Sequence, residues 1–189
     1  MGQIFVKTAK AFVSAGYVSF SINYRLNSTG KIDVTVLGSA VSDVLSAIRW
    51  IRTHSDEYEI NPDKIAGDSA GGGIVINTAY SDSGKTLIKG CIDLWGGLCF
   101  NRLNKDANQW GEPVNYFPIE PDVPPTCIIH GDKDEVVPFR TSEDLANELN
   151  RSSVYNELHV LKGAFHYPEA RADQFIPLMV ENFVYICTK

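Results

Sequence analysis

A serine flanked by glycines is the stretch of this sequence best suited to nucleophilic chemistry. The residues read Gly67-Asp68-Ser69-Ala70-Gly71, which fits the pattern G-x-S-x-G. This pattern places a serine at the tip of a sharp turn between a strand and a helix. Small residues are needed two positions before and after the serine, because a side chain there would collide with the neighbouring strand or helix. The alternative is an ordinary loop, since the same residue types favour turns.

Acidic residues and a histidine follow two later segments that read as strands. Asp132, Asp134 and Glu135 come after the apolar run 126–129, and His166 comes after the run 155–161. The order serine, acid, histidine is the order expected for a hydrolase with a nucleophile elbow. A neighbouring imidazole base, itself oriented by a carboxylate, activates a serine hydroxyl that is otherwise a weak nucleophile. On spacing alone, the three acids remain competing candidates.

The other three histidines have structural interpretations. His54 lies at the end of a polar helix pattern, which predicts a solvated side chain. His159 lies inside a strand pattern, where a structural role is favoured. His130 precedes a glycine at a strand end, and we expect it to order the acidic loop.

Composition and charge exclude several classes of partner. The 189 residues carry a net charge of −6 and no prominent Lys/Arg cluster, so we expect neither a nucleic-acid nor a membrane partner. The four cysteines show no metal-ligand spacing, and we expect no metal. No signal peptide and no apolar run of about 18 residues is present. On that basis we expect a soluble, cytoplasmic protein, although the N-terminus looks incomplete.

The segments that must position these groups alternate between helical and strand patterns. Apolar residues recur at helical spacing over 3–15, 38–54 and 168–186, and further helices are expected over 70–80 and 139–150. Strand patterns cover 17–24, 64–66, 87–94, 126–129 and 155–161. This alternation predicts an α/β fold in a single domain over 1–189, with a mostly parallel sheet of about five strands and helices on both faces. In such sheets, functional groups gather beyond the carboxyl ends of the strands.

The stretch 95–123 is too long and too irregular to be a simple connection. It is rich in Gly, Pro, Asn and aromatic residues, and we predict an irregular insertion. Its aromatic side chains are candidates for the wall of a pocket that binds an acyl or aromatic group, chiefly Trp95, Phe100 and Trp110, with Tyr116 and Phe117. An equal alternative is that they only cover the sheet.

Six segments together resemble the α/β-hydrolase superfamily, specifically its carboxylesterase and lipase-like branches. GDSAGG at 67–72 is similar to hormone-sensitive-lipase-type esterases. HGDKDEVVP at 130–138 is similar instead to acetyl-xylan and feruloyl esterases, dienelactone hydrolases and prolyl peptidases. The remaining four are YVSFSINYRL (17–26), DVLSAIRWIR (43–52), INPDKI (60–65) and ELHVLKGAFH (157–166).

The resemblance implies a serine carboxylesterase that acts on short-chain acyl or carbohydrate-linked esters of the acetyl or feruloyl type. In the second motif the acid is the aspartate four residues after the histidine, which selects Asp134. The implied triad is Ser69, His166 and Asp134, with the N–H of Ala70 as one oxyanion donor. The implied substrate is a small-molecule ester, and neither a metal nor a cofactor is needed.

The sequence also departs from the family pattern at its start. Members carry several strands and a His-Gly-Gly-Gly loop before the helix at 3–15, and that loop supplies further oxyanion donors. We therefore expect a missing strand beside 17–24, an exposed apolar edge that favours a homodimer, and another donor, such as a backbone N–H of Trp95-Gly96-Gly97. The alternative functions are a catalytically impaired hydrolase-like binding module, a fragment of a longer esterase, and a peptidase.

Overall fold

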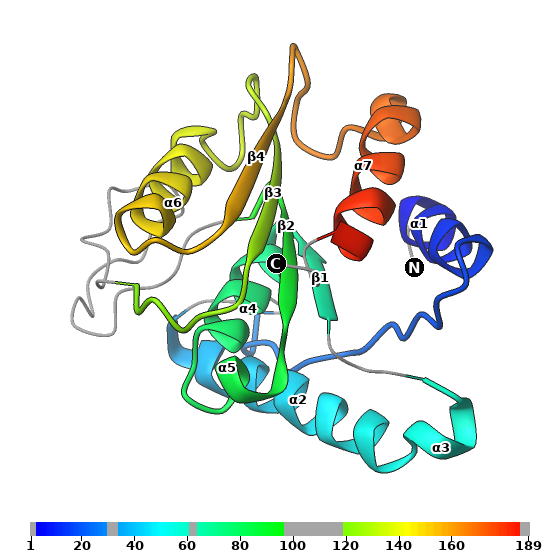
Figure 1. Cartoon of the computed structure of the whole chain (residues 1–189). Helices are drawn as coiled ribbons and strands as arrows, with labels where there is room; N and C mark the ends of the chain where they lie inside the picture. Colours follow the sequence, from blue (N-terminus) through cyan, green and yellow to red (C-terminus); the bar gives the residue numbers. More distant parts are fainter. Residues whose placement is uncertain (1–2, 30–33, 61–63, 97–118, 186–189) are drawn as a thin grey trace.

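The computed structural model describes residues 3–29, 34–60, 64–96 and 119–185, and alternates helices with strands as expected (Figure 1). The elements before the serine turn are α1 (Gln3–Ser14), α2 (Val34–Thr53), α3 (Ser55–Tyr58) and β1 (Lys64–Asp68). The elements that follow it are α4 (Ala70–Ala79), α5 (Gly84–Leu87), β2 (Gly90–Leu94), β3 (Thr126–Gly131), α6 (Arg140–Arg151), β4 (Asn156–Leu161), the 3₁₀ helix η1 (Glu169–Arg171) and α7 (Ala172–Tyr185). Most of the predicted insertion, including Phe100 and Trp110, lies outside the described residues.

The four strands form one parallel sheet in the order β1-β2-β3-β4. Every residue of β2 and β3 is buried, because these central strands are covered on both faces. The parallel register brings all four carboxyl ends to one edge of the sheet, where Asp68 pairs with Leu94 and Gly131 pairs with Leu161. The segments that carry Ser69, Asp134 and His166 all leave the sheet from this edge.

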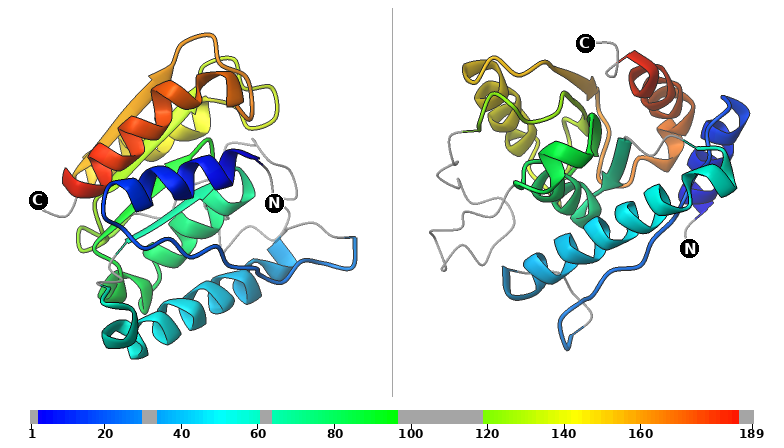
Figure 2. Two further views of the ribbon diagram at one scale, coloured as in Figure 1. Left: turned by 90° about the vertical axis from the view of Figure 1, so that its right-hand side faces the viewer. Right: turned by 60° about the horizontal axis from the view of Figure 1, so that its bottom comes forward.

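Helices pack on both faces of the sheet, as predicted (Figures 1 and 2). On one face, α2, α4 and α6 contribute side chains such as Val44, Ile74 and Leu149 to one buried cluster. On the other face, α1 and α7 bury Phe12 and Phe175 in a second cluster. None of the described helices combines the length and apolarity needed to cross a lipid bilayer.

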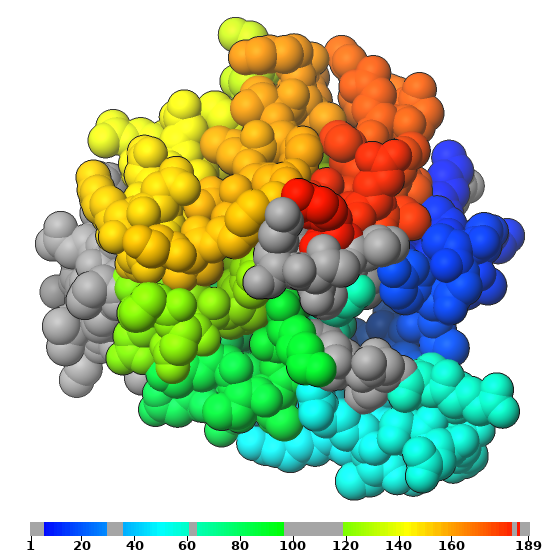
Figure 3. All heavy atoms as spheres, in the orientation of Figure 1, coloured from blue at the N-terminus to red at the C-terminus, as the bar shows by residue number. Residues whose placement is uncertain are grey.

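The predicted strand at 17–24 is not a strand, and the described sheet has four strands where about five were expected. The segment runs beside β1 in the same direction: the ammonium of Lys64 lies 5.5 Å from the Tyr17 ring centroid, and Tyr24 interacts electrostatically with Asp68. No ladder joins the two, and Figure 3 shows a hollow between the blue N-terminal region and the cyan helices α2 and α3. Strand pairing requires a separation of about 4.8 Å. The alternating side chains satisfy the strand pattern, but the segment pairs with no strand among the described residues.

We expect the edge at β1 to support a homodimer. β1 ends the described sheet with its side chains only partly covered, and Val18 and Phe20 of the neighbouring segment are about half exposed. Unpaired strand edges and exposed apolar side chains favour association. Light scattering at micromolar concentration should give twice the mass of the chain, and a monomeric mass would contradict this prediction.

Candidate active site

Ser69 lies at a strained turn between β1 and α4. Its φ of 49° and ψ of −119° are unusual for a residue with a side chain, and its N–H donates to the carbonyl of Leu94 at 2.9 Å. Gly67 permits the turn, because a Cβ there would lie 2.3 Å from the carbonyl oxygen of Gly71. The strand therefore runs against the first turn of α4, and the serine side chain projects from the tip between them.

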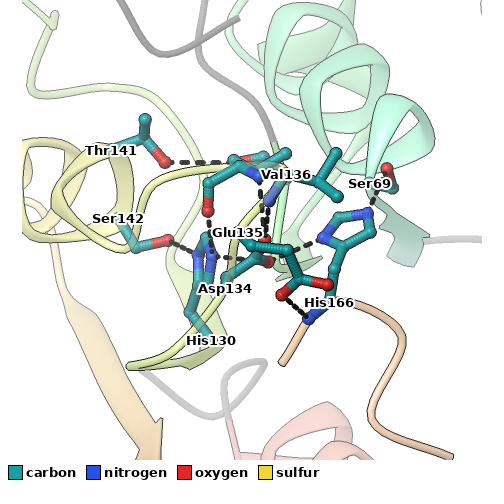
Figure 4. A network of polar contacts seen from close by, with 10 residues as sticks. Ser69, His130, Asp134, Glu135, Val136, Thr141, Ser142 and His166 are labelled. Carbon is teal, nitrogen blue, oxygen red and sulfur yellow. Dashed lines mark hydrogen bonds and ion pairs between the residues drawn. The ribbon is translucent and has the colours of Figure 1, made fainter. Parts of the chain in front are cut away.

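The structure brings Ser69, His166 and Asp134 together in one line of hydrogen bonds (Figure 4). Ser69 Oγ lies 2.9 Å from His166 Nε2, and His166 Nδ1 lies 2.6 Å from Asp134 Oδ2. Because the carboxylate accepts at Nδ1, that nitrogen carries the proton and leaves Nε2 free to accept from the serine hydroxyl. The His166 and Asp134 side chains are buried, which removes competing water. This arrangement matches the geometric requirement for an activated nucleophile.

The three acidic residues in the loop after β3 make different contacts. Asp134 Oδ1 accepts the N–H groups of Val136 and Val137, each at 2.8 Å, which fixes the carboxylate that contacts His166. Asp132 accepts the N–H of Gly163 at 2.6 Å, and this bond holds the pKa of its carboxyl below the ordinary value. Glu135 accepts the backbone N–H of His166 at 3.2 Å. Asp132 and Glu135 thus tie the acid loop to the histidine loop, and only Asp134 reaches the imidazole.

His130 forms a hydrogen bond with the Asp134 carboxylate, in keeping with the ordering role expected from the sequence. Its Nε2 lies 3.1 Å from Asp134 Oδ2 and 3.0 Å from the Val137 carbonyl, both acceptors, so Nε2 carries the proton. Its Nδ1 accepts from the Ser142 hydroxyl at 2.7 Å. Burial lowers the pKa of His130, although Asp134 opposes the shift. A neutral His130 therefore donates to the carboxylate that orients His166.

The two remaining histidines lie away from this line of hydrogen bonds. His159 lies within reach of Glu157 and Asn182, at 3.1 and 3.2 Å, in keeping with a structural role. His54 is not simply solvated as predicted: it is partly buried and stacks on Trp50 with ring centroids 4.1 Å apart. Trp50 lies in the last turn of α2 and His54 directly follows that helix, four residues later, so their rings lie on the same side of the chain.

Of the backbone N–H groups expected to stabilise an oxyanion, two are engaged elsewhere in the fold. Ala70 is the first residue of α4, where the backbone N–H has no intrahelical acceptor. The N–H of Trp95 instead donates to the carbonyl of Ile129 at 2.7 Å, and the N–H of Gly96 interacts with the Asp93 carboxyl. The suggestion of a donor from Trp95 or Gly96 is therefore wrong, because the fold already uses both groups. Gly97 lies outside the described residues.

Trp95, a predicted substrate-binding residue, has its side chain in the core. It is 1% exposed and packs edge-on against Phe175 of α7, with ring centroids 5.2 Å apart. It lines a cavity of about 90 Å³ together with Thr8, Gly67 and Phe175, among others. This cavity lies between β1, α1 and α7, on the far side of the sheet from α4. Trp95 therefore covers the sheet, which was the alternative interpretation.

A buried acid beside the serine turn was not identified from the sequence. Asp93 of β2 is 3% exposed, and its Oδ1 has no hydrogen-bond partner among the described residues. The Asp93 carboxyl lies against the backbone of both Gly72 and Gly96. A Cβ added to Gly72 would lie 2.2 Å from Oδ1, and one added to Gly96 would lie 2.0 Å from it. Burial raises the pKa of Asp93 to about 7, and the nearby Asp68 carboxylate adds to the shift. Only the pairing of β1 with β2 places this residue under α4.

We predict that Asp93 makes the stability of the protein fall between about pH 4 and pH 7. The folded protein holds a proton that the unfolded chain, with an ordinary pKa of 3.8, has released, so rising pH favours unfolding. Asp93→Asn keeps the shape and removes the titration. Relative to the parent, its free energy of unfolding in urea denaturation should be about 3 kcal/mol larger at pH 8 than at pH 5. An equal difference at both pH values would contradict this assignment.

The described residues contain no group of three His, Cys, Asp or Glu side chains arranged to hold a metal ion.

A comparison with protein families places the chain in a known group. The family model described as BD-FAE matches residues 1–96 and 96–149. The chain belongs to the BD-FAE family. Both the serine turn and the acid loop of this BD-FAE chain fall within the matched residues, whereas His166 follows them.

The chain is also similar to individual relatives and solved structures. The probable carboxylic ester hydrolase LipM of Mycobacterium tuberculosis is 24% identical over 89% of the chain and 47% of its own length. The BD-FAE chain thus spans about half of that relative. Among solved structures, Est2 of Thermogutta terrifontis, an esterase, has a TM-score of 0.77 at 24% identity, covering 97% of this chain and 76% of Est2. A truncated carbohydrate esterase from gut microbiota has a TM-score of 0.72 at 21% identity, covering 89% and 74%. The fold of this BD-FAE chain is the α/β-hydrolase fold, as the sequence motifs implied.

Proposed function

We propose that this BD-FAE chain is a serine ester hydrolase in which Ser69 is the nucleophile. The observation that carries the proposal is the unbroken line from Ser69 Oγ to His166 Nε2 at 2.9 Å and from His166 Nδ1 to Asp134 Oδ2 at 2.6 Å. Three loops far apart in the sequence supply these groups at one edge of the sheet. The name of the relative LipM also supports ester hydrolysis.

The geometry leads to a two-step reaction. Ser69 Oγ bonds to the ester carbonyl carbon while its proton moves to His166 Nε2. The N–H of Ala70 donates to the carbonyl oxygen as it becomes negative. The C–O bond to the alcohol then breaks, and Nε2–H protonates the departing alkoxide. Water attacks the acyl-enzyme by the same route in reverse, giving the acid and free Ser69, while Asp134 stabilises the charged form of His166 in each step.

The proposed substrates are short-chain acyl or carbohydrate-linked esters of the acetyl or feruloyl type. Est2 was solved with propionate bound, and the gut-microbiota neighbour is named a carbohydrate esterase; both names support this choice. The mechanism uses water and the three side chains, so we propose that no cofactor takes part.

Hydrolysis of a p-nitrophenyl ester series, from acetate to octanoate, tests the proposal. Acetate and propionate should be cleaved fastest, and Ser69→Ala should reduce the rate to background. A fluorophosphonate should label the parent protein but not Ser69→Ala. Equal hydrolysis by both proteins would overturn the assignment of Ser69.

A catalytically impaired binding module is the second candidate, and one observation favours it. The N–H groups of Trp95 and Gly96 are already engaged, which leaves Ala70 as the oxyanion donor identified in the described residues. Loss of one donor costs about 3–4 kcal/mol, or roughly a hundred- to a thousand-fold in rate. Rapid fluorophosphonate labelling with slow ester turnover would indicate an impaired enzyme, whereas a folded protein without labelling would indicate a binding module.

A further inference from the structure

Two large apolar side chains beside the Ser69–His166 pair are exposed to solvent. Tyr167 is 53% exposed and Val136 is 54% exposed. Tyr167 meets the His166 imidazole edge-on, with ring centroids 4.3 Å apart and an interplanar angle of 76°. Val136 belongs to the acid loop, and its N–H donates to Asp134 Oδ1 at 2.8 Å. Tyr167 therefore stands next to the imidazole, and Figure 4 shows Val136 on the same side of the site, close to His166.

The backbone holds Tyr167 in a conformation that a tyrosine rarely adopts. Its φ is 52°, in the left-handed region, and its carbonyl accepts the N–H of Glu169 at 2.7 Å. Left-handed backbone at a residue with a large side chain costs of order 1 kcal/mol or more, and such strain clusters at functional sites. This backbone conformation leaves the phenol ring outside the core, beside His166. The ring therefore contributes little to core packing.

Tyr167 and Val136 thus place an exposed aromatic ring and an exposed aliphatic side chain on the histidine side of the site. We call these two side chains the histidine-side rim.

The position of this rim identifies the part of an ester that it would contact. In the proposed reaction, His166 Nε2 donates its proton to the departing alcohol oxygen, so that oxygen must lie within hydrogen-bonding distance of Nε2. The carbonyl oxygen of the ester lies instead toward the N–H of Ala70. The substituent on the alcohol oxygen consequently extends past His166 and over the histidine-side rim.

We propose that the histidine-side rim binds the alcohol portion of the substrate and favours esters whose alcohol carries an aromatic or other flat apolar ring. This inference rests on the proposed function and adds the class of leaving group to it. Aromatic side chains contact such rings through offset or edge-on packing, and removal of one contact typically costs about tenfold in binding.

Two acetate esters with different alcohols provide the test. Benzyl acetate and methyl acetate share an acyl group and release alcohols of similar acidity, so the ratio of their kcat/KM values reports binding of the ring. Tyr167→Ala should lower kcat/KM for benzyl acetate about tenfold and for methyl acetate less than about twofold. Val136→Ala should lower the benzyl acetate value by about threefold, in line with a smaller lost contact, and Tyr167→Phe should retain most of the parent ratio.

Tyr58→Ala serves as the matched control. Tyr58 is also an exposed tyrosine, 42% exposed, but it lies on α3, which precedes β1 and so stands at the opposite end of the sheet from Ser69. Its benzyl-to-methyl ratio should equal that of the parent.

The outcomes separate this inference from the proposed function. Ser69-dependent cleavage of methyl acetate with an unchanged ratio in Tyr167→Ala would overturn the rim and leave the esterase intact. An equal loss for both esters would also overturn it, because it would indicate that Tyr167 only positions His166. Absence of Ser69-dependent cleavage of either ester by the parent would overturn both proposals.

Discussion

Asp134→Asn is expected to lower kcat for ester hydrolysis by about 10⁴-fold. The carboxylate accepts from His166 Nδ1 at 2.6 Å, which keeps Nε2 unprotonated and able to take the serine proton. An asparagine can present its NH₂ group to Nδ1 and stabilise the opposite tautomer, in which Nε2 carries the proton. The shape of the site is retained, and the base is lost. Steady-state hydrolysis of p-nitrophenyl acetate measures the effect.

Asp132→Asn is the matched control, two residues away in the same loop. Its oxygen can still accept the N–H of Gly163, and the side chain does not reach the imidazole. Activity should stay within about tenfold of the parent. A large loss in Asp132→Asn with little change in Asp134→Asn would reverse the choice of acid. Circular dichroism of both variants checks that the fold is intact.

Gly67→Ala is expected to destabilise the protein by about 3 kcal/mol or more. The new Cβ would lie 2.3 Å from the carbonyl oxygen of Gly71 and 2.7 Å from Val75 Cγ2, and the nearer contact is backbone that cannot rotate away. Relief requires α4 to move off β1, which would also displace Ser69 from His166. Urea denaturation should show a lower midpoint, and ester hydrolysis should fall with it.

Gly38→Ala is the control for the effect of adding a methyl group to a glycine. Gly38 lies inside α2, and a Cβ there would meet nothing within 4 Å. Alanine has the higher helix propensity, so this variant should be more stable than the parent by about 0.5–1 kcal/mol. Equal destabilisation by both substitutions would contradict the steric explanation for Gly67.

The sequence patterns predicted the five longer helices and the four strands of the sheet, but they failed at residues 17–24. The predicted helices correspond to α1, α2, α4, α6 and α7, each of which contributes apolar side chains to the two buried clusters. Tyr17–Tyr24 has the alternation of a strand, yet the segment pairs with no described strand. Alternation reports which side chains are apolar, whereas a strand also needs a neighbouring backbone to complete its hydrogen bonds.

The candidate site was predictable to the extent that local motifs specify it. The glycines around Ser69 require a sharp turn for steric reasons, and the loops that carry Asp134 and His166 follow strands whose ends meet at one edge. The choice of Asp134 over Asp132 needed the resemblance of the 130–138 segment to known esterases. The structure gives a physical reason for the same choice, since Asp132 is held by Gly163 while Asp134 reaches His166.

The sequence by itself determined the serine turn, the order of the three groups and the alternation of helix with strand, because each depends on local sterics or on local periodicity. Tertiary structure alone decided that the N–H groups of Trp95 and Gly96 are already engaged, that Asp93 is buried under α4, and that Tyr167 stands beside His166. These features depend on contacts between distant segments and on the register of neighbouring strands. The Ser69 turn could therefore be identified from the sequence motif, whereas the groups that surround it depend on how the sheet and its loops pack together.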